Sequence, residues 1–222
     1  MTLFKTHEAL DYIAPYMPQN PIIVEAGAFN GSDTTRLARM WPDGHIHAFE
    51  PVPELFHAAQ QRTAAYTNVT CYQYALSDHD GSAQLYLSEK PSKPGKVSQG
   101  NSLLAPKERL KHSSLQFNTT ITVPTLSLDS WAEKYAIDHV DLLWLDMQGH
   151  ELAVVQASRA ILPTVRAIFT EVSFIESYTN QPQLDDVIAW MNSHGFVERG
   201  RDFSTTTGWF FGNMLFVKKG TV

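Results

Sequence analysis

Residues 21–34 read PIIVEAGAFNGSDT, an apolar run followed by a small-residue turn and a polar stretch. This pattern predicts a buried parallel strand, a turn and the start of a helix. The turn contains Gly27 and Gly31, and residues without side chains let a ligand reach backbone N–H groups at a helix N-terminus. Glu50 stands 19 residues after Gly31 (50 − 31 = 19), where a carboxylate can accept both hydroxyls of a ribose. We therefore predict a nucleoside cofactor, the alternative being an ordinary turn whose glycines serve packing.

The glycine spacing argues against a dinucleotide. The pattern G-x-G-x-x-G has a middle glycine where the backbone approaches a pyrophosphate, whereas residues 28–30 here are AFN. Glu25, at the end of the strand, would repel a phosphate and attract an ammonium. S-adenosylmethionine carries an ammonium and a ribose but no phosphate, so these residues favour it over NAD. The cofactor-binding residues predicted in this region are Glu25, Gly27, Phe29, Asn30, Gly31, Ser32 and Glu50.

The composition limits the class of protein. A length of 222 residues predicts one domain over 1–222, and a net charge of −6 argues against nucleic-acid binding. Cys71 is the single cysteine, which excludes an intrachain disulfide and a cysteine-rich zinc site. No stretch has the length of a membrane span and no secretory signal is recognisable, so we expect a cytoplasmic protein.

Strand-like and helix-like segments alternate, which predicts an α/β fold with a mostly parallel sheet. Strands are expected at about 21–26, 45–50, 69–75, 82–88, 120–126, 140–146 and 167–172, and an antiparallel hairpin at 196–199 and 213–218. Helices are expected at about 6–16, 32–41, 53–65, 151–160 and 183–193, with another beginning near 127–131. Seven main strands with helices on both faces indicate a Rossmann-like methyltransferase sheet more than a plain dinucleotide fold.

Residues 88–120 interrupt this alternation. The segment contains several prolines and glycines, and it carries six Lys or Arg against two Glu, a local charge of +4 (6 − 2) in a chain of −6. One interpretation is a solvated loop. The other is a loop over the active-site face that favours an anionic acceptor.

Polar side chains also follow the ends of two further predicted strands. Ser77 and Asp78 follow the third strand, and Asp146 ends a later one. Ligands of an open parallel sheet bind beyond these carboxyl ends, so we expect these residues to join the acids described above. Asp78 is predicted to accept from an adenine amino group or, equally, to form the turn before Gly81.

Residues 146–151 read DMQGHE. Asp146 is expected to border the methionine and sulfonium end of the cofactor, with Met147 and Gln148 beside it. An acceptor hydroxyl loses a proton during methyl transfer, so His150 is a candidate general base. The alternative for His150 is a surface histidine at the start of a helix.

Other positions also carry two interpretations. Glu171 is a second candidate base or substrate anchor, or else a structural hydrogen-bond partner at the end of its strand. Glu151 is placed to cap the following helix through the helix dipole. The aromatic residues 209–211 are expected to pack in the core or to form the floor of an acceptor pocket.

With these residues in view, the chain resembles the FkbM family of S-adenosylmethionine-dependent methyltransferases. The matching segments are EAGAFNG at 25–31, FEP at 49–51, ALSD at 75–78 with Gly81, LDMQGHE at 145–151, GF at 195–196 and NMLF at 213–216. The resemblance spans residues 20–218 and implies a class I methyltransferase sheet and O-methylation of a sugar or polyketide hydroxyl. Two positions depart from the family pattern, because Glu25 stands where Asp is frequent and Gln148 where many members carry Glu. A divalent metal is therefore not supported by the sequence.

The leading hypothesis is an O-methyltransferase acting on a small molecule or glycan. Methylation of nitrogen or carbon on the same fold is the alternative, and a non-catalytic cofactor-binding protein is a further one. The candidate catalytic residues are Asp146, His150 and Glu171. The candidate cofactor-binding residues are those given above for the region 25–50, together with Ser77, Asp78, Asp146, Met147 and Gln148.

Overall fold

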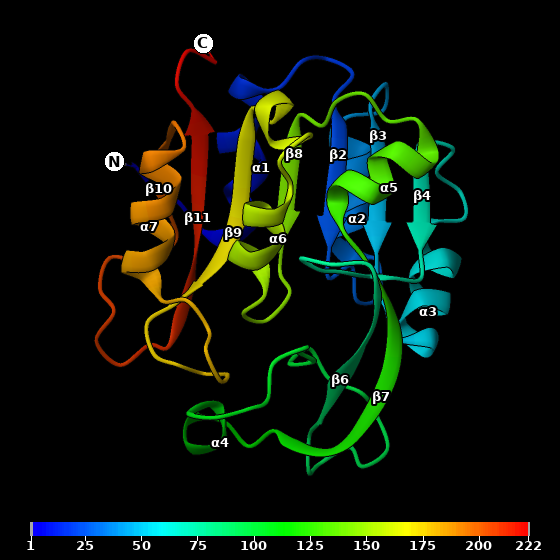
Figure 1. The fold of residues 1–222 in the computed structure, drawn as a ribbon, viewed down its shortest axis with the longest axis vertical. Coiled ribbons are helices and arrows are strands. Elements are labelled where there is room, and N and C mark those ends of the chain that lie inside the picture. Colours follow the sequence, from blue (N-terminus) through cyan, green and yellow to red (C-terminus); the bar gives the residue numbers. More distant parts are fainter. Residues whose placement is uncertain (1, 222) are drawn as a thin grey trace.

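The computed structural model describes residues 2–221, which form a large twisted sheet between two helical layers and a smaller sheet beneath it (Figure 1). The large sheet has eight strands in the order β1-β10-β11-β9-β8-β2-β3-β4. Its strands are β1 (Thr2–Leu3), β2 (Ile22–Ala26), β3 (His45–Phe49), β4 (Val69–Tyr72), β8 (Leu142–Leu145), β9 (Ala167–Ser173), β10 (Phe196–Arg201) and β11 (Phe211–Lys218). Strand β11 is antiparallel to β9 and β10, whereas the other neighbours are parallel. The prediction of a mostly parallel sheet with a C-terminal hairpin is thus confirmed, with the short β1 as an added edge.

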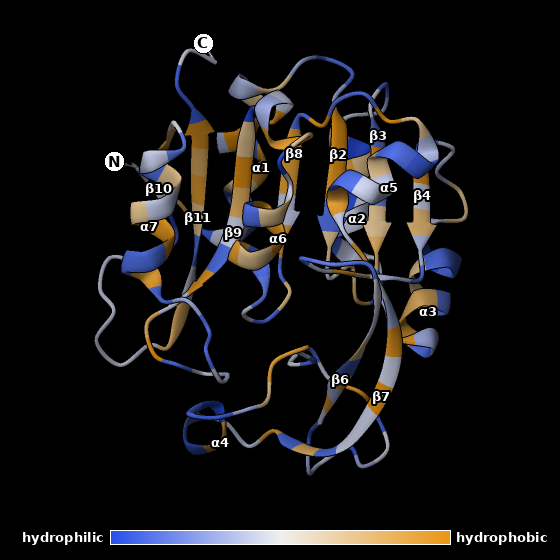
Figure 2. Ribbon diagram, viewed as in Figure 1, coloured by the Kyte–Doolittle hydropathy of each residue, from blue (hydrophilic) through white to orange (hydrophobic). Residues whose placement is uncertain are grey.

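The central strands are apolar on both faces because both faces are covered. In β8, Leu142 and Trp144 pack with α1 (Ala9–Ile13) and α2 (Ser32–Met40). Leu143 and Leu145 point the other way, toward α5 (Leu128–Tyr135), α6 (Glu151–Ala157) and α7 (Leu184–Ser193). Figure 2 shows this as strands that are largely hydrophobic along their length. A side chain buried in this way stabilises the fold by about 1.5–3 kcal/mol.

The register of the parallel strands brings the site residues to one level. Ala26 pairs with Phe49 of β3 and with Leu145 of β8, and these are the last residues of their strands. The residues that follow, Gly27, Glu50 and Asp146, therefore leave the sheet side by side.

The smaller sheet has the order β5-β7-β6 and lies beyond the carboxyl ends of the large one (Figure 1). It contains β5 (Ala75–Leu76), β6 (Gly81–Glu89) and β7 (Gln116–Leu126). The prediction of one strand over 69–75 is wrong, because β4 ends at Tyr72 and residues 75–76 pair with β7 instead.

The segment 88–120 also contains more regular structure than its composition predicts. β7 begins at Gln116, opposite Glu89 of β6, and α4 (Arg109–His112) forms a short helical turn. The first residues of β7 are mostly exposed, so they lack the alternation of buried and exposed side chains that identifies a strand.

The remaining helical elements are η1 (Thr6–Glu8), η2 (Ala14–Tyr16), α3 (Pro53–Thr63) and η3 (Leu162–Thr164). Across residues 2–221, the helices are too short or too polar for any of them to span a membrane.

Candidate active site

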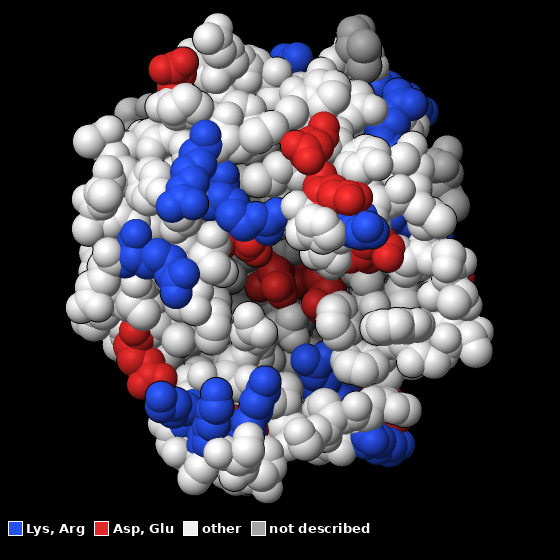
Figure 3. Space-filling model, turned by 180° about the vertical axis from the view of Figure 1, so that it is seen from behind, with Lys and Arg blue, Asp and Glu red and all other residues white. Residues whose placement is uncertain are grey.

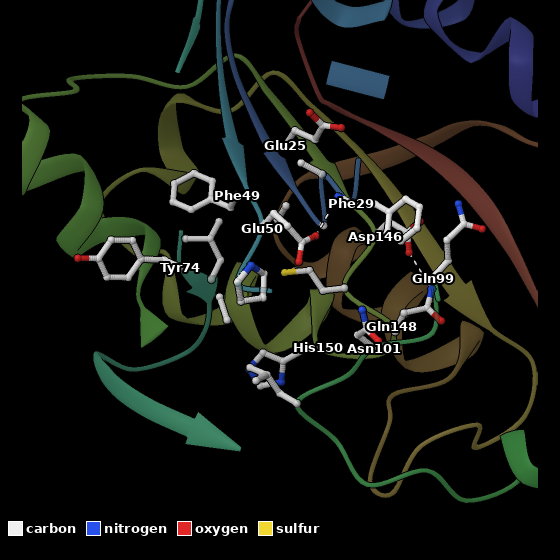
Figure 4. A pocket seen from close by; sticks show the side chains of 18 of the residues that line it. Glu25, Phe29, Phe49, Glu50, Tyr74, Gln99, Asn101, Asp146, Gln148 and His150 are labelled. Atoms are coloured by element: carbon white, nitrogen blue, oxygen red, sulfur yellow. Dashed lines mark hydrogen bonds between the residues drawn. The ribbon is translucent and has the colours of Figure 1, made fainter. Parts of the chain in front are cut away.

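A pocket opens at the carboxyl ends of β2, β3 and β8 and encloses about 840 Å³ of empty space, including its mouth. Figure 3 shows acidic side chains deep in a hollow of the surface, with Lys and Arg around its rim. Figure 4 shows the pocket from close by. Nine of the sequence-predicted residues line it: Glu25, Gly27, Phe29, Ser32, Glu50, Asp146, Met147, Gln148 and His150.

Gly27 allows the turns after β2 and β8 to touch. Its φ of +89° is in the left-handed region, and a Cβ at this position would lie 1.9 Å from the carbonyl oxygen of Asp146. The N–H groups of Gly27 and Ala28 both donate to the carbonyl of Phe49 at 3.0 Å, which ties the same turn to β3. A glycine is therefore required here for packing, and the packing brings Asp146 to the edge of the pocket.

Gly31 and Asn30 shape the turn rather than the pocket wall. Gly31 has a φ of +77°, and a Cβ there would lie 3.0 Å from Cα of Ala59 on α3. The Asn30 side chain accepts a hydrogen bond from the N–H of Ser32 at 3.2 Å. Both residues thus act on the pocket through the conformation of the turn.

Glu50 is held by two backbone N–H groups. Its Oε2 accepts from Phe29 and its Oε1 from Val52, each at 2.9 Å. Burial raises the pKa of Glu50 to about 7, although these two hydrogen bonds oppose the rise. A carboxylate oxygen can accept a second hydrogen bond, so the fixed carboxylate is able to receive ribose hydroxyls from the pocket side.

Glu25 is buried with its Oε2 lacking any hydrogen-bond partner in the described part of the chain. Burial and the neighbouring acids raise its pKa to about 8. A buried carboxylate without a partner is costly and is relieved by a cation. An ammonium group of a molecule bound in the pocket would meet this requirement.

The apolar end of the pocket lies around Phe49 and Tyr74, on the side opposite Gln99 in Figure 4. His150 belongs to a polar group near this end, since its Nε2 lies 3.2 Å from the hydroxyl of Ser77 and 3.8 Å from Oδ1 of Asp78. Burial lowers the pKa of His150 despite the nearby Asp78. The structure therefore groups His150 with Ser77 and Asp78, and the hydrogen bonds within residues 2–221 do not join it to Asp146 or Glu171.

Asp146 and Glu171 are joined by an amide. Nε2 of Gln148 donates to Oδ1 of Asp146 at 2.8 Å and to Oε2 of Glu171 at 3.3 Å. The hydroxyl of Tyr178 lies 3.2 Å from Oε1 of Gln148 and 2.9 Å from the carbonyl of Gly100. Gln148 itself has a φ of +55°, so its backbone is held in an uncommon conformation at this point.

Asp146 and Glu171 differ in their exposure to the pocket. Asp146 is exposed to the pocket, whereas Glu171 is buried beside a smaller hollow. Desolvation by the surrounding protein raises the pKa of both carboxyl groups, and the positive charge of Arg109 opposes the rise. Asp146 is therefore the acid of this pair that a molecule entering the pocket can meet.

Glu151 has a structural role just before and at the start of α6. Its carboxylate accepts from the N–H groups of Met147 at 2.7 Å and of Gly149 at 2.9 Å, so it closes the turn before α6. The carboxylate thus shapes the loop that carries Gln148.

The segment 88–120 covers part of the pocket. Gln99, Asn101 and Leu103 line it, and the hydroxyl of Ser102 donates to the carbonyl of Gln148 at 2.8 Å. Gln99, Asn101 and Tyr178 were not among the sequence-predicted site residues. Their placement depends on loops that meet only in the folded chain, and no local pattern signals it.

Metal ligands are not clustered. Residues 2–221 contain no group of three or more His, Cys, Asp and Glu side chains arranged to hold a metal ion.

The fold and the pocket define the class. A sheet in which the antiparallel β11 lies between β9 and β10, with a pocket at the ends of β2, β3 and β8, is that of a class I methyltransferase. The chain belongs to the FkbM family, because the sequence model of the methyltransferase FkbM domain matches residues 25–198. The resemblance seen in the motifs is thereby confirmed, and the chain is a methyltransferase that uses S-adenosylmethionine.

Individual relatives agree with this assignment. The 2-O-methyltransferase NoeI of Sinorhizobium fredii (strain NBRC 101917 / NGR234) is 27% identical over 179 residues, 80% of this chain and 74% of NoeI. Methyltransferase sdnD of Sordaria araneosa is 30% identical over 166 residues, 63% of this chain and 61% of its own length.

Solved structures share the fold at low identity. The magnesium protoporphyrin IX methyltransferase of Synechocystis PCC 6803, with bound S-adenosylmethionine, has a TM-score of 0.52 and 14% identity over 96% of this chain and 77% of its own. An rRNA methylase from Streptococcus thermophilus has a TM-score of 0.55 and 13% identity over 98% of each chain.

The buried acids predict a pH dependence of stability in the ligand-free protein. The pKa of Glu25 is raised from 4.5 to about 8, so the folded protein retains a proton that the unfolded chain releases. Buried histidines such as His47, whose pKa burial lowers from 6.5, act in the opposite direction only below that value. The free energy of unfolding should therefore fall as pH rises from about 6.5 to about 8.

Urea unfolding across this range measures the slope, and Glu25→Gln serves as the control because it removes the titrating group. We expect a flatter slope in the variant. A wild-type stability that rises between these pH values would contradict the assignment of a protonated Glu25.

Proposed function

We propose that this protein transfers the methyl group of S-adenosylmethionine to a hydroxyl oxygen of a small molecule or glycan, with Asp146 as the general base. The observation that carries the proposal is the placement of Asp146, which opens onto the pocket while Gln148 holds its carboxylate. Its raised pKa brings it closer to the operating pH, as suits a group that must take up a proton. The similarity to a protein named as a 2-O-methyltransferase supports oxygen as the acceptor atom.

The cofactor is proposed to lie across the carboxyl ends of the strands. Glu25 would receive its ammonium and Glu50 its ribose hydroxyls, while the apolar end near Phe49 and Tyr74 would take the adenine. Ser77 and Asp78 would border that adenine. The remaining cofactor residues are proposed to shape the pocket wall or its turns: Gly27, Phe29, Asn30, Gly31, Ser32, Met147 and Gln148.

The reaction then needs few protein groups. S-adenosylmethionine would supply the methyl group: the acceptor oxygen would bond to the methyl carbon as the C–S bond breaks, and S-adenosylhomocysteine would leave. The hydroxyl proton passes to Asp146. Glu171, through Gln148, would keep the base in place. Holding the two reactants in line supplies much of the rate.

Methyl transfer to a mixed panel of hydroxylated, amine-containing and carbon-nucleophile compounds tests the proposal. The protein is incubated with isotope-labelled S-adenosylmethionine, and the products are identified by mass spectrometry. A methyl ether is the expected product. A methylated amine or carbon would favour the alternative reactions, and binding of S-adenosylhomocysteine with no turnover would indicate a non-catalytic protein.

Cofactor selectivity gives a direct prediction. S-adenosylhomocysteine should bind and NAD should not, because an ammonium can ionise Glu25 and pair with it, whereas a pyrophosphate offers this buried carboxyl group neither a charge partner nor a donor. Glu25→Gln should weaken binding of S-adenosylhomocysteine by about 10- to 100-fold, as expected for loss of one charged hydrogen bond. Calorimetric titration measures this, with Glu54→Gln on the exposed side of α3 as the matched control. Equal affinity of the Glu25→Gln and Glu54→Gln variants for S-adenosylhomocysteine would show that Glu25 does not bind the cofactor.

A further inference from the structure

The part of segment 88–120 that faces the pocket is tied to the rest of the protein on two sides. The N–H of Ser102 donates to the carbonyl of Tyr86 on β6 at 3.2 Å, and the N–H of Tyr86 donates back to Ser102 at 2.8 Å. The hydroxyl of Ser102 donates to the carbonyl of Gln148 at 2.8 Å. Asn101 therefore adjoins a residue that is anchored both to β6 and to the turn after β8.

The side chain of Asn101 has a fixed orientation. Its Oδ1 accepts hydrogen bonds from the N–H of Ser88 at 2.9 Å and from the hydroxyl of Ser88 at 3.2 Å. A backbone N–H can only donate, so this contact identifies the amide oxygen and places the NH2 group on the other side. The hydrogen bonds within residues 2–221 leave Nδ2 without an acceptor, and Asn101 lines the pocket. The amide is thus a pre-oriented donor for a molecule in the pocket.

The position of Asn101 favours the methyl acceptor over the cofactor as its partner. Figure 4 shows Asn101 near Gln148 and well apart from Glu25. The ammonium and the carboxylate of the cofactor are bonded to one carbon atom, so a carboxylate whose ammonium meets Glu25 also stays near Glu25. Gln148 donates to Asp146 at 2.8 Å, which places the proposed base on the side of Asn101. A hydroxyl compound at Asp146 would thus have Asn101 as a neighbour.

The segment presents neutral side chains to the pocket, although it is basic. Gln99, Asn101 and Leu103 line the pocket, and its lining within residues 2–221 includes no Lys or Arg. The lysines of the segment are exposed: Lys90, Lys93, Lys96, Lys107 and Lys111. An anionic group beside an ionised Asp146 would meet a like charge and no cation on the pocket wall. The wall therefore suits a neutral acceptor better than an anionic one.

We propose that Asn101 determines acceptor specificity by donating to a neutral oxygen that neighbours the methylated hydroxyl. This inference rests on the proposed methyl transfer to a hydroxyl group with Asp146 as base. The reacting hydroxyl would donate to Asp146 while the neighbouring oxygen accepts from Asn101, and these two contacts select which hydroxyl faces the cofactor. The path from Asn101 through Ser102 and Gln148 to Asp146 is short, so the two acceptor oxygens should lie on adjacent carbons. The acceptor class is thus a neutral compound with two vicinal oxygens.

Methyl transfer to a matched series of cyclohexane alcohols tests the proposal. The probes are cyclohexanol, trans-cyclohexane-1,2-diol, trans-cyclohexane-1,4-diol and trans-2-hydroxycyclohexane-1-carboxylate, which share a ring and differ in their second group. Per hydroxyl group, kcat/KM of the wild-type protein for the 1,2-diol should exceed that for cyclohexanol and the 1,4-diol by about 3- to 10-fold, as expected for one neutral hydrogen bond. The carboxylate should be a poorer substrate than the 1,2-diol.

Asn101→Asp is the main variant, because it keeps an oxygen toward Ser88 and replaces the NH2 group with an acceptor. It should remove the preference for the 1,2-diol without changing the affinity for S-adenosylhomocysteine in calorimetric titration. Asn101→Ala, which adds no charge, should also remove the preference. Asn118→Asp is the matched control, since Asn118 is exposed on β7 and does not line the pocket, and it should retain the preference.

Three results would overturn the proposal. They are a wild-type protein without preference for the 1,2-diol, a preference that persists in both Asn101 variants, and a loss of affinity for S-adenosylhomocysteine in Asn101→Asp, which would assign Asn101 to the cofactor. If none of the four probes is methylated while the mixed panel described above yields methyl ethers, the proposal is also wrong. Absence of any methyl ether from that panel would instead count against the proposed function, so the two failures are distinguishable.

Discussion

Gly27→Ala is expected to destabilise the protein by about 2–5 kcal/mol and to abolish binding of S-adenosylhomocysteine. The added Cβ would lie 1.9 Å from the carbonyl oxygen of Asp146 and 2.9 Å from its carbonyl carbon, and both atoms belong to backbone. A φ of +89° adds the strain of a left-handed conformation. The turns after β2 and β8 would have to separate, which moves Asp146 and opens the pocket.

Gly195→Ala is the matched control for this experiment. Gly195 has a similar φ of +83°, but a Cβ there meets nothing within 4 Å. It should therefore cost only the conformational strain, about 1–2 kcal/mol, and leave cofactor affinity unchanged. Denaturant unfolding and calorimetric titration measure the two effects. If both variants lose the same stability and both bind the cofactor, the contact between the turns is not essential.

Asp146→Asn should lower turnover by about 100- to 10,000-fold while binding of S-adenosylhomocysteine persists. The substitution keeps the shape of the side chain and its oxygen toward Gln148, but an amide takes up no proton at neutral pH. Because an ionised base is required, the wild-type rate should rise with pH through the raised pKa of Asp146.

Glu171→Gln is the comparison variant, since Glu171 shares the same amide and lies beside the smaller hollow. We expect it to affect turnover less than Asp146→Asn does. Full activity in Asp146→Asn would exclude Asp146 as the base, and a larger loss in Glu171→Gln would transfer that role to Glu171. Single-turnover assays with labelled S-adenosylmethionine separate the rate of methyl transfer from product release.

The positions of the acids at the strand ends could be predicted from the sequence, whereas the residues of segment 88–120 that line the pocket could not. Glu25, Glu50 and Asp146 are placed by the sheet, because carboxyl ends of parallel strands meet at one edge regardless of the intervening loops. Gln99 and Asn101 depend instead on loops that meet only in the folded chain, and no local pattern signals their placement. The division of the predicted strand 69–75 likewise depends on β7, a distant part of the chain.

The position of Gln148 has a consequence for how this site could change over time. The side-chain NH2 group of Gln148 places partial positive charge against two carboxylates, as a bound cation does in metal-dependent sites. Glutamine and glutamate are separated by a single nucleotide in their codons. That one exchange would replace an internal donor with a third carboxylate beside Asp146 and Glu171. A single nucleotide therefore decides whether this cluster is neutralised from within the protein or gathers three like charges at the edge of the pocket.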